Sequence, residues 1–401
     1  MVVYFAFLFH IYQPPIQIPS VIKQIVKESY RPIIDALIAH PESKISLNIN
    51  GTLTEQLHDF GYDDLIGLIT TLASRNQLEF TGSGKFHPLL PLIPEPEIKR
   101  QIELNNKTNQ HFFGKLYKPR GFFPPEMAIN EEVLKTVKKA GFDWIIMSGI
   151  ANTLPEFPTT FVSQYSKGLN LIFRDDYISI DCAFDKINTV DAFIKRLYYK
   201  HTSEDYYVIA AMDGETFGHH VRHAIRNFLI PLFDTVPHRN DVKLCTVSEI
   251  VDKFPKGRNQ VPRDSSWSTM PYDIATDVPY PLWFDPNNQI HIEQHRFFMY
   301  ALTLIHLSAK YREGMNDDKK RIFDNARNLL DRGIHSCQQW WASQRPFYSP
   351  DMILRGLNEV LMASVNARRS IPDTNPDIKE AMELIMNDML KAQNKIVLSL
   401  I

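Results

Sequence analysis

The sequence of 401 residues predicts an α/β protein, in which a parallel barrel is followed by an all-helical segment. Two observations lead to this prediction. Up to about residue 250, short apolar runs alternate with helical patterns, as expected when crossover helices bury both faces of a parallel sheet. From about residue 291 onward, helical patterns follow one another without a strand-like run between them.

The predicted strands are short and mostly apolar. The first, residues 2–10 (VVYFAFLFH), is a continuous apolar run, which is typical of a strand that is covered on both faces. The other predicted strands are residues 44–50, 78–82, 120–126, 142–148, 169–175, 206–213 and 243–248. Seven or eight such units in about the length of a TIM barrel favour a closed barrel over an open sheet.

The clearest helical pattern between the strands is residues 130–141 (NEEVLKTVKKAG). Asn130 occupies the N-cap position, glutamates fill the first turn, lysines lie near the end, and Gly141 follows. Further along, the chain becomes rich in Pro, Ser, Asp and Asn and loses its periodicity. We therefore expect three parts, which are a barrel over residues 1–255, an irregular connection over 256–290 and a helical domain over 291–401.

Composition narrows the class of protein. The net charge is −2, from 44 basic and 46 acidic side chains, which gives no indication of a nucleic-acid or membrane partner. The three cysteines, Cys182, Cys245 and Cys337, are far apart and indicate reduced thiols. The start of the chain lacks a basic n-region and a small-residue cleavage site, so we interpret it as a buried strand and expect a cytoplasmic protein.

Polar side chains stand where the predicted strands end, and in parallel barrels the C-terminal strand ends gather the functional groups. Glu126 follows two prolines that stiffen its backbone, although it could equally cap the next helix. Asp213 ends an apolar strand, where burial would raise its pKa as a general acid requires; it could also simply bond to loop N–H groups. Gly214 is expected to turn Glu215 toward the loop. Two such carboxylates can hydrolyse a glycosidic bond.

Two weaker patterns accompany the carboxylates. His219 and His223 are four residues apart, and together with Asp213 they could bind a divalent metal, as a deacetylase would require. Trp267 and Trp283 fall in segments that could line the mouth of the barrel, where flat rings suit sugar faces. Tryptophans are nevertheless more often part of a core.

Taken in order, several segments resemble glycoside hydrolase family 57. They are FHIYQPP (9–15), NINGTLTEQL (48–57), TGSGKFHPLLPLIP (81–94), PPEMAI (124–129), MDGETFGHH (212–220) and SCQQWWASQRPFYSPDMI (336–353). The resemblance covers about residues 5–360. It implies a distorted parallel (β/α)7 TIM-like barrel and a C-terminal helical domain that completes the cleft. It also implies retaining chemistry on α-glucans or maltooligosaccharides, with no cofactor and no metal in the catalytic step.

The resemblance makes Glu126 the nucleophile and Asp213 the general acid/base. The predicted substrate-binding residues are His10, His87, Glu215, Trp267, Trp283 and Asp351. We therefore predict a retaining, α-amylase-like glycoside hydrolase. Three alternatives stay open: a 4-α-glucanotransferase or branching enzyme of the same family, a metal-dependent polysaccharide deacetylase, and a non-enzymatic carbohydrate-binding protein.

Overall fold

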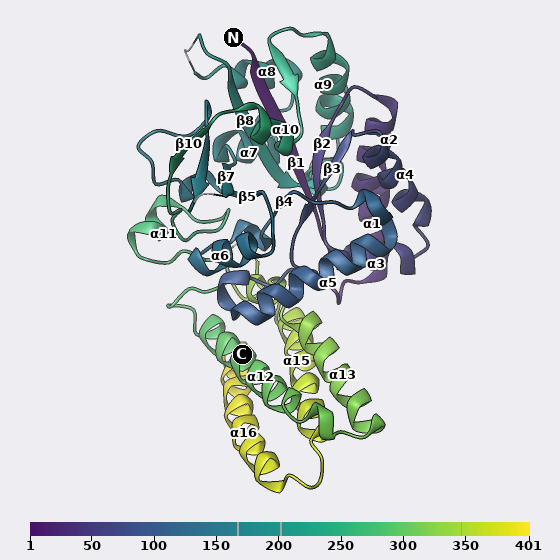
Figure 1. The fold of residues 1–401 in the computed structure, drawn as a ribbon, viewed down its shortest axis with the longest axis vertical. Coiled ribbons are helices and arrows are strands. Elements are labelled where there is room, and N and C mark those ends of the chain that lie inside the picture. The colour runs from purple at the N-terminus through teal and green to yellow at the C-terminus, as the bar shows by residue number, and fades with distance from the viewer. Residues whose placement is uncertain (167, 201–202, 346) are drawn as a thin grey trace. The chain divides into compact units, whose positions relative to one another are not determined.

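The computed structural model describes residues 1–166, 168–200, 203–345 and 347–401. The chain divides into two compact units, Met1–Trp267 and Ser268–Ile401. The first unit is built around a curled, mostly parallel sheet with helices around it, and the second unit is helical (Figure 1).

The hydrogen-bonded strand order in the first unit is β10-β6-β7-β5-β4-β3-β2-β1-β8, with β9 paired to β1. The strand bounds are β1 (Val3–Ile11), β2 (Ile45–Ile49), β3 (Leu78–Gly82), β4 (Gly121–Phe122), β5 (Trp144–Met147), β6 (Val162–Tyr165), β7 (Leu169–Phe173), β8 (Tyr206–Asp213), β9 (Val242–Leu244) and β10 (Lys256–Asn259). Apolar periodicity did not reveal β6, which pairs antiparallel with β7, or β10, whose residues are all exposed.

Seven parallel neighbours, from β8 through β1–β5 to β7, form the barrel wall. In the part of the chain that the structure describes, no regular ladder closes the wall between β7 and β8. Individual hydrogen bonds connect β8 to the residues that follow β7 and to those that precede β6. The Asp175 amide donates to the Ile209 carbonyl at 2.8 Å, and the Tyr207 amide donates to the Thr159 carbonyl at 2.8 Å. The wall is therefore a distorted seven-stranded parallel barrel, and the predicted fold class is confirmed.

The helices of the first unit cover this wall (Figure 1). They are α1 (Pro19–Ile25), α2 (Arg31–Ala39), α3 (Gly51–Asp59), α4 (Asp63–Ser74), α5 (Glu95–Phe113), α6 (Glu131–Lys139), α7 (Asp176–Ala183), α8 (Val190–Leu197), α9 (Ile230–Thr235) and α10 (Val247–Lys253). The pattern that predicted α6 is confirmed, because the Asn130 side chain accepts from the Val133 amide at 2.9 Å and Gly141 has φ +86°. A π-helical turn, Val26–Tyr30, lies between α1 and α2, and another, Ile225–Leu229, precedes α9.

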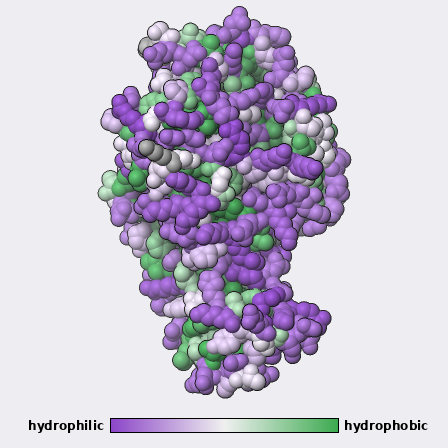
Figure 2. Space-filling view, in the orientation of Figure 1, coloured by the Kyte–Doolittle hydropathy of each residue, from purple (hydrophilic) through white to green (hydrophobic). Residues whose placement is uncertain are grey.

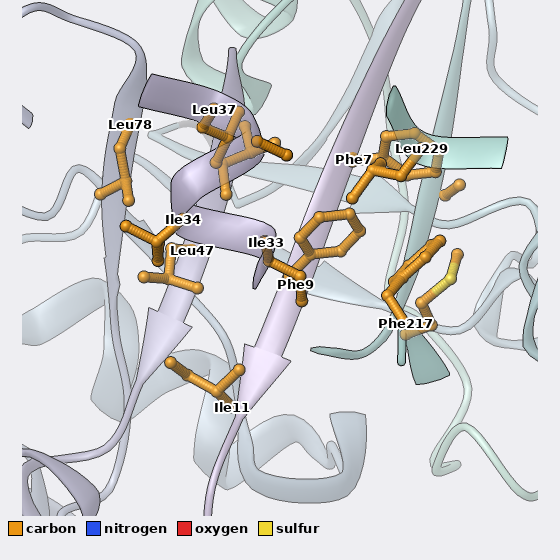
Figure 3. Close-up of a cluster of buried hydrophobic side chains, with 14 of the residues drawn as sticks. Phe7, Phe9, Ile11, Ile33, Ile34, Leu37, Leu47, Leu78, Phe217 and Leu229 are labelled. Atoms are coloured by element: carbon orange, nitrogen blue, oxygen red, sulfur yellow. The ribbon is translucent and has the colours of Figure 1, made fainter. Parts of the chain in front are cut away.

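Alternation along β1 divides the core into an outer and an inner layer. Phe5, Phe7 and Phe9 belong to the outer cluster, which includes buried side chains of α2 (Figure 3). Tyr4, Ala6 and Leu8 belong to the cluster that includes alternate residues of β8, β5 and β7. Because side chains of a strand alternate between its faces, His10 continues the inner series after Leu8 and reaches the C-terminal end of the barrel.

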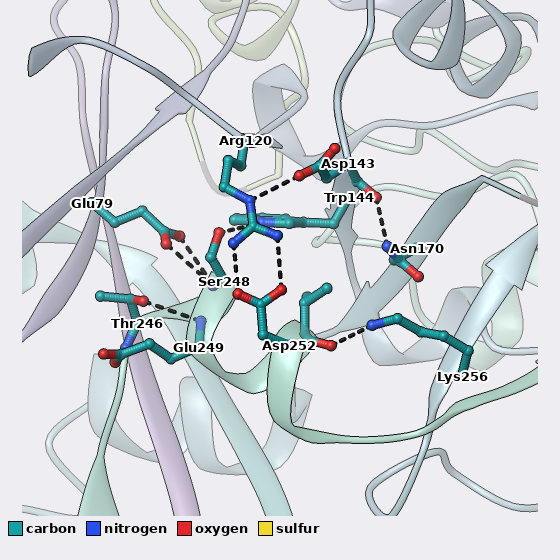
Figure 4. A network of polar contacts seen from close by, with 11 residues as sticks. Glu79, Arg120, Asp143, Trp144, Asn170, Thr246, Ser248, Glu249, Asp252 and Lys256 are labelled. Atoms are coloured by element: carbon teal, nitrogen blue, oxygen red, sulfur yellow. Dashed lines mark hydrogen bonds and ion pairs between the residues drawn. The ribbon is translucent and has the colours of Figure 1, made fainter.

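A polar network holds α10 against the N-terminal ends of β4 and β5 (Figure 4). The guanidinium of Arg120 bonds to Asp143 and, through two nitrogens, to Asp252, with all three distances 2.8 Å. The buried Trp144 indole donates to the Ser248 hydroxyl at 2.9 Å. These contacts connect β4, β5 and α10, and they stabilise the end of the barrel away from the strand C-termini.

The second unit consists of α11 (Pro271–Ala275), α12 (Gln289–Ala309), α13 (Asp317–Gly333), α14 (Cys337–Trp340), α15 (Pro350–Ser370) and α16 (Pro376–Ser399). Within it, α15 packs against α13, and α12 packs against α16 and α15. Hydrophilic side chains cover most of the molecular face that is visible in Figure 2. Across the described ranges, every helix is too short or too polar to cross a bilayer.

Candidate active site

Glu126 lies just beyond the end of β4, in a strained part of the backbone. Pro124 and Pro125 follow the two-residue strand, and then Glu126 and Met127 adopt φ angles of 59° and 48°. Each non-glycine residue in this left-handed region costs on the order of 1 to 2 kcal/mol, so such a backbone persists only where its surroundings hold it. The Glu126 side chain is 13% exposed, which leaves its carboxylate largely enclosed.

Trp267 holds the Glu126 carboxylate, and His87 lies beside it. The Trp267 indole N–H donates to Glu126 Oε2 at 3.0 Å, and the Trp267 amide donates to the Glu126 carbonyl at 3.0 Å. His87 Nδ1 lies 3.6 Å from Glu126 Oε1. Because the tryptophan binds both the backbone and the side chain, it fixes the direction in which the carboxylate points.

A stack of rings extends from His87 to the centre of the barrel mouth. The ring of His87 stacks on Tyr12 with 4.1 Å between centroids and on His10 with 4.8 Å, and His10 stacks on Phe123 with 4.8 Å. His87 itself has φ 58°, another strained position. This stack packs His10 and His87 tightly, and it offers no room for either ring to rotate freely.

The hydrogen bonds around His10 assign its tautomer. Asn48 Nδ2 donates to the Thr81 hydroxyl at 2.9 Å, so Asn48 Oδ1 accepts the proton of His10 Nδ1, at 2.7 Å. Burial lowers the pKa of His10 to about 4, so the ring is neutral at pH 7. Its Nε2 is consequently an acceptor, which suits a hydroxyl donor such as a sugar.

Asp213 is the last residue of β8 and the neighbour of His10. The two residues are paired in the parallel register of β1 and β8, so their side chains project from the same face of the sheet. Burial raises the pKa of Asp213, and the nearby Arg174 guanidinium partly offsets this increase. A carboxyl group in this setting holds its proton to a higher pH than an exposed one and can act as a general acid.

Arg174 connects the Asp213 strand to the residue that holds Glu126. It donates to the Ala211 carbonyl at 3.2 Å and to the Trp267 carbonyl at 2.9 Å. The path Glu126–His87–His10–Asp213 makes a second connection, through one close contact, one ring stack and one strand pair. The structure therefore brings together both predicted carboxylates with His10, His87 and Trp267 at the C-terminal end of the barrel.

Glu215 has a different environment from Asp213, although only one residue separates them. It lies in the turn Gly214–Thr216, is 6% exposed, and accepts from Gln13 Nε2 at 2.9 Å and from the Tyr30 hydroxyl. Burial and the charge of Asp213 raise the pKa of Glu215. Its role as a substrate contact stays a prediction, because its carboxylate is bound to protein groups.

Trp283 and Asp351 belong to the second unit, and His219 and His223 form separate ion pairs. Trp283 is 1% exposed and precedes α12 in the second unit, while Asp351 is exposed in the first turn of α15, so their substrate roles also stay predictions. His219 and His223 bond to different carboxylates, Glu28 at 2.6 Å and Asp185 at 3.1 Å. Among residues that the structure describes, no three His, Cys, Asp or Glu side chains form a group that could bind a metal.

Sequence reasoning assigned no role to Tyr12, Gln13 or Tyr30. Tyr12 and Gln13 belong to the motif FHIYQPP, so their proximity to His10 along the chain was an available signal. Tyr30 had no such signal, because it is 185 residues from Glu215 in the sequence.

Comparison with known proteins identifies the family. The model of glycosyl hydrolase family 57 matches residues 6–262, which is more than half of the chain. The chain belongs to this family. The predicted resemblance is therefore confirmed, and the matched range includes Glu126, Asp213, His10 and His87.

Two curated relatives illustrate the range of this family. The α-amylase of Pyrococcus horikoshii is 26% identical over 338 residues, which are 79% of this chain and 52% of the relative. The 4-α-glucanotransferase of Thermococcus litoralis is 25% identical over 271 residues, which are 64% of this chain and 40% of the relative. This family 57 chain thus spans about half the length, or less, of these two relatives.

Solved structures agree with the fold of this family 57 chain. A branching enzyme from Pyrococcus horikoshii aligns with a TM-score of 0.74 and 16% identity, covering 96% of this chain and 94% of that one. The 4-α-glucanotransferase structure from Thermococcus litoralis aligns with a TM-score of 0.68 and 20% identity, covering 90% and 60%. At these identities the likeness supports the distorted barrel fold.

Proposed function

We propose that this protein is a retaining glycoside hydrolase that acts on α-glucans. The observation that carries the proposal is the pair of carboxylates at one end of the barrel, Glu126 and Asp213, in contrasting environments. Glu126 is held by a strained backbone and by an indole hydrogen bond, whereas burial raises the pKa of Asp213. Retaining hydrolysis needs one carboxylate that attacks and another that carries a proton.

In the first step, a carboxylate oxygen of Glu126 attacks the anomeric carbon and forms a covalent glycosyl ester. Asp213 gives its proton to the departing glycosidic oxygen as the bond to the anomeric carbon breaks. In the second step, the Asp213 carboxylate takes a proton from a water molecule, whose oxygen attacks the same carbon and releases Glu126. The product keeps the anomeric configuration of the substrate, and Asp213 ends protonated.

The groups around the carboxylates have supporting roles in this mechanism. The neutral His10 can accept a hydrogen bond from a sugar hydroxyl through Nε2. Trp267 fixes the direction of Glu126 attack through its hydrogen bond to Oε2. Such fixed positioning contributes to the rate because the reacting atoms start close to their bonding distance.

Transfer to a sugar acceptor is the second candidate, and the relative named 4-α-glucanotransferase favours it. The same covalent intermediate serves both reactions, since only the acceptor hydroxyl differs. The experiment incubates the purified full chain with maltooligosaccharides of single lengths and with soluble α-glucan, and resolves the products by chain length. Hydrolysis increases the number of reducing ends, whereas transfer redistributes chain lengths at a constant number. If neither changes with any α-glucan, the proposal is wrong.

Chelation separates this proposal from the deacetylase alternative. We expect activity on α-glucan to survive exhaustive treatment with EDTA, because the two-carboxylate mechanism needs no Lewis acid. A deacetylase would lose its activity and regain it with a divalent metal. That second result, together with acetate release from an acetylated polysaccharide, would contradict the mechanism.

A further inference from the structure

The π-helical turn Val26–Tyr30 lies against the loop that follows Asp213. It interrupts the helical layer between α1 and α2. In a π-helical turn each backbone hydrogen bond spans five residues instead of four, and such turns are rare and often mark a functional site.

Three consecutive residues of the turn bond to the loop. The Ser29 hydroxyl donates to the Gly214 carbonyl at 2.9 Å, and the Tyr30 hydroxyl donates to Glu215 Oε1. Glu28 Oε2 pairs with His219 Nδ1 at 2.6 Å. The partners lie at positions +1, +2 and +6 from Asp213, so the turn binds the loop immediately beyond the proposed acid.

The backbones also approach closely at Gly218. This glycine has φ +96°, and a Cβ built on it would lie 1.9 Å from the Glu28 carbonyl oxygen. No other residue fits that position without moving the turn away. The contact therefore consists of three side-chain bonds and one backbone approach that only glycine permits.

This contact buries polar groups and a carboxylate, which costs free energy that a purely structural contact between apolar side chains would not require. Ser29 and Tyr30 are 0% and 2% exposed, and Glu215 is 6% exposed. A buried carboxylate with two donors is usually no more stabilising than well-packed apolar side chains of similar volume. What it adds is a directional constraint on Gly214 and Glu215, the two residues that follow Asp213.

We propose that the π-helical turn Val26–Tyr30 is the positioning element of the Asp213 loop, and that Tyr30 and Glu215 are positioning residues that act through Asp213. Neither side chain touches the sugar. This inference rests on the proposed role of Asp213 as the acid/base. It differs from the earlier prediction that Glu215 contacts substrate, and it adds a residue, Tyr30, for which the sequence carried no signal.

The test compares Tyr30→Phe with a matched control, Tyr206→Phe. Tyr206 is also a fully buried tyrosine; its hydroxyl donates to the Leu197 carbonyl at 2.6 Å, and it begins the strand that Asp213 ends. Both substitutions remove one buried hydroxyl. Each variant is assayed with a maltooligosaccharide, whose leaving group needs a proton, and with α-maltosyl fluoride, whose leaving group does not.

We expect Tyr30→Phe to lower kcat/KM for the maltooligosaccharide by about 10- to 100-fold, as misplacement of a catalytic group does. For the fluoride, the loss should be less than about threefold, since protonation contributes little there. The alkaline limb of the pH profile for the maltooligosaccharide should also move, because Tyr30 contacts Glu215, whose charge lies beside Asp213; the other titratable or charged groups at this loop are Arg174, His10 and the Glu28–His219 pair. Tyr206→Phe should leave kcat/KM for both substrates close to the parent values.

Three results would overturn the positioning role. Tyr30→Phe could behave like the control, or it could lower kcat/KM equally for both substrates. It could also raise KM alone, and that result would indicate direct contact between Tyr30 and the sugar. If Tyr30→Phe does not fold, Ser29→Ala removes a bond from the same turn and is assayed in the same way. Asp213→Ala is measured in parallel: without leaving-group selectivity in that variant, the proposed function itself fails, whereas selectivity there and none in Tyr30→Phe rejects only the positioning role.

Discussion

The barrel holds its two carboxylates in opposite ways. Glu126 follows a two-residue strand and lies in a left-handed stretch of backbone; the Trp267 indole donates to its carboxylate, and His87 Nδ1 lies 3.6 Å from it. Asp213 ends the eight-residue strand β8, in regular extended backbone, and the contacts to its loop come from the helical layer behind it.

This difference matches what the two proposed roles require. A nucleophile must point at one carbon, and a strained backbone fixed by an indole provides that direction. A general acid needs a raised pKa, and the end of a long buried strand provides desolvation. The direction of the Glu126 carboxylate therefore comes from the groups that contact it, and the raised pKa of Asp213 comes from its burial.

The largest effect is expected from Glu126→Gln. Loss of the nucleophile should lower kcat by at least about 10⁴-fold. The fold should survive, because the glutamine amide oxygen can still accept from the Trp267 indole. Turnover is measured with a maltooligosaccharide and folding by circular dichroism, with Glu131→Gln, on the exposed start of α6, as the control. Near-parental turnover of folded Glu126→Gln would remove this residue from the mechanism.

A smaller and substrate-dependent effect is expected from Asp213→Ala. Loss of the general acid should lower kcat/KM about 10²- to 10⁴-fold for a poor leaving group and far less for a fluoride. Azide should accelerate this variant and yield the α-glycosyl azide, because it attacks the glycosyl ester that Glu126 still forms. Glu215→Ala is the comparison. If Glu215→Ala shows this pattern while Asp213→Ala does not, the two roles are reversed.

Asp213→Asn should stabilise the folded protein at neutral pH. Burial raises the pKa of Asp213, so between the unfolded and folded pKa values the folded state binds more protons, and the free energy of unfolding falls as pH rises through that window. The asparagine has no such titration, and we expect a gain of roughly 1 to 3 kcal/mol at pH 7 that disappears near pH 4. Urea unfolding of the parent and the variant at pH 7 and at pH 4 measures this difference in the free energy of unfolding.

Asp252→Asn is the matched control for that measurement, with the opposite sign. The hydrogen bonds from Arg120 lower the pKa of Asp252, so its contribution to stability is present above the unfolded pKa and is lost as pH falls. Its asparagine variant should be slightly destabilised at pH 7. A stabilised Asp252→Asn, or an Asp213→Asn without any gain, would contradict the proposed contrast between the two sites.

The smallest effect is expected from Asn130→Ala, four residues beyond Glu126. Loss of the bond to the Val133 amide should cost about 1 kcal/mol of unfolding free energy, and Asn130→Ser should recover most of it. Because Trp267 holds both the backbone and the side chain of Glu126, kcat should stay within about twofold of the parent. A large drop in kcat would show that the cap of α6 also positions the nucleophile.

The sequence alone determined most of the elements, although it missed β6 and β10, and it extended the strands at 120–126 and 243–248 beyond β4 (Gly121–Phe122) and β9 (Val242–Leu244). The apolar run of β1, the capped pattern of α6, and the positions of Glu126 and Asp213 at strand ends all follow from local periodicity and from the conformational preferences of proline, asparagine and glycine. These are short-range properties, so they can be predicted before any contact between distant residues is known.

Only the tertiary structure decided which distant groups meet. Trp267 binds Glu126 across 141 residues, and Tyr30 binds Glu215 across 185 residues. His219 and His223, at metal-ligand spacing in the sequence, instead pair with Glu28 and Asp185. Such contacts depend on how the barrel closes and on where a π-helical turn falls. Barrel closure and the position of the turn produce no periodic pattern in the sequence, because both are set by packing between segments that are far apart in the chain.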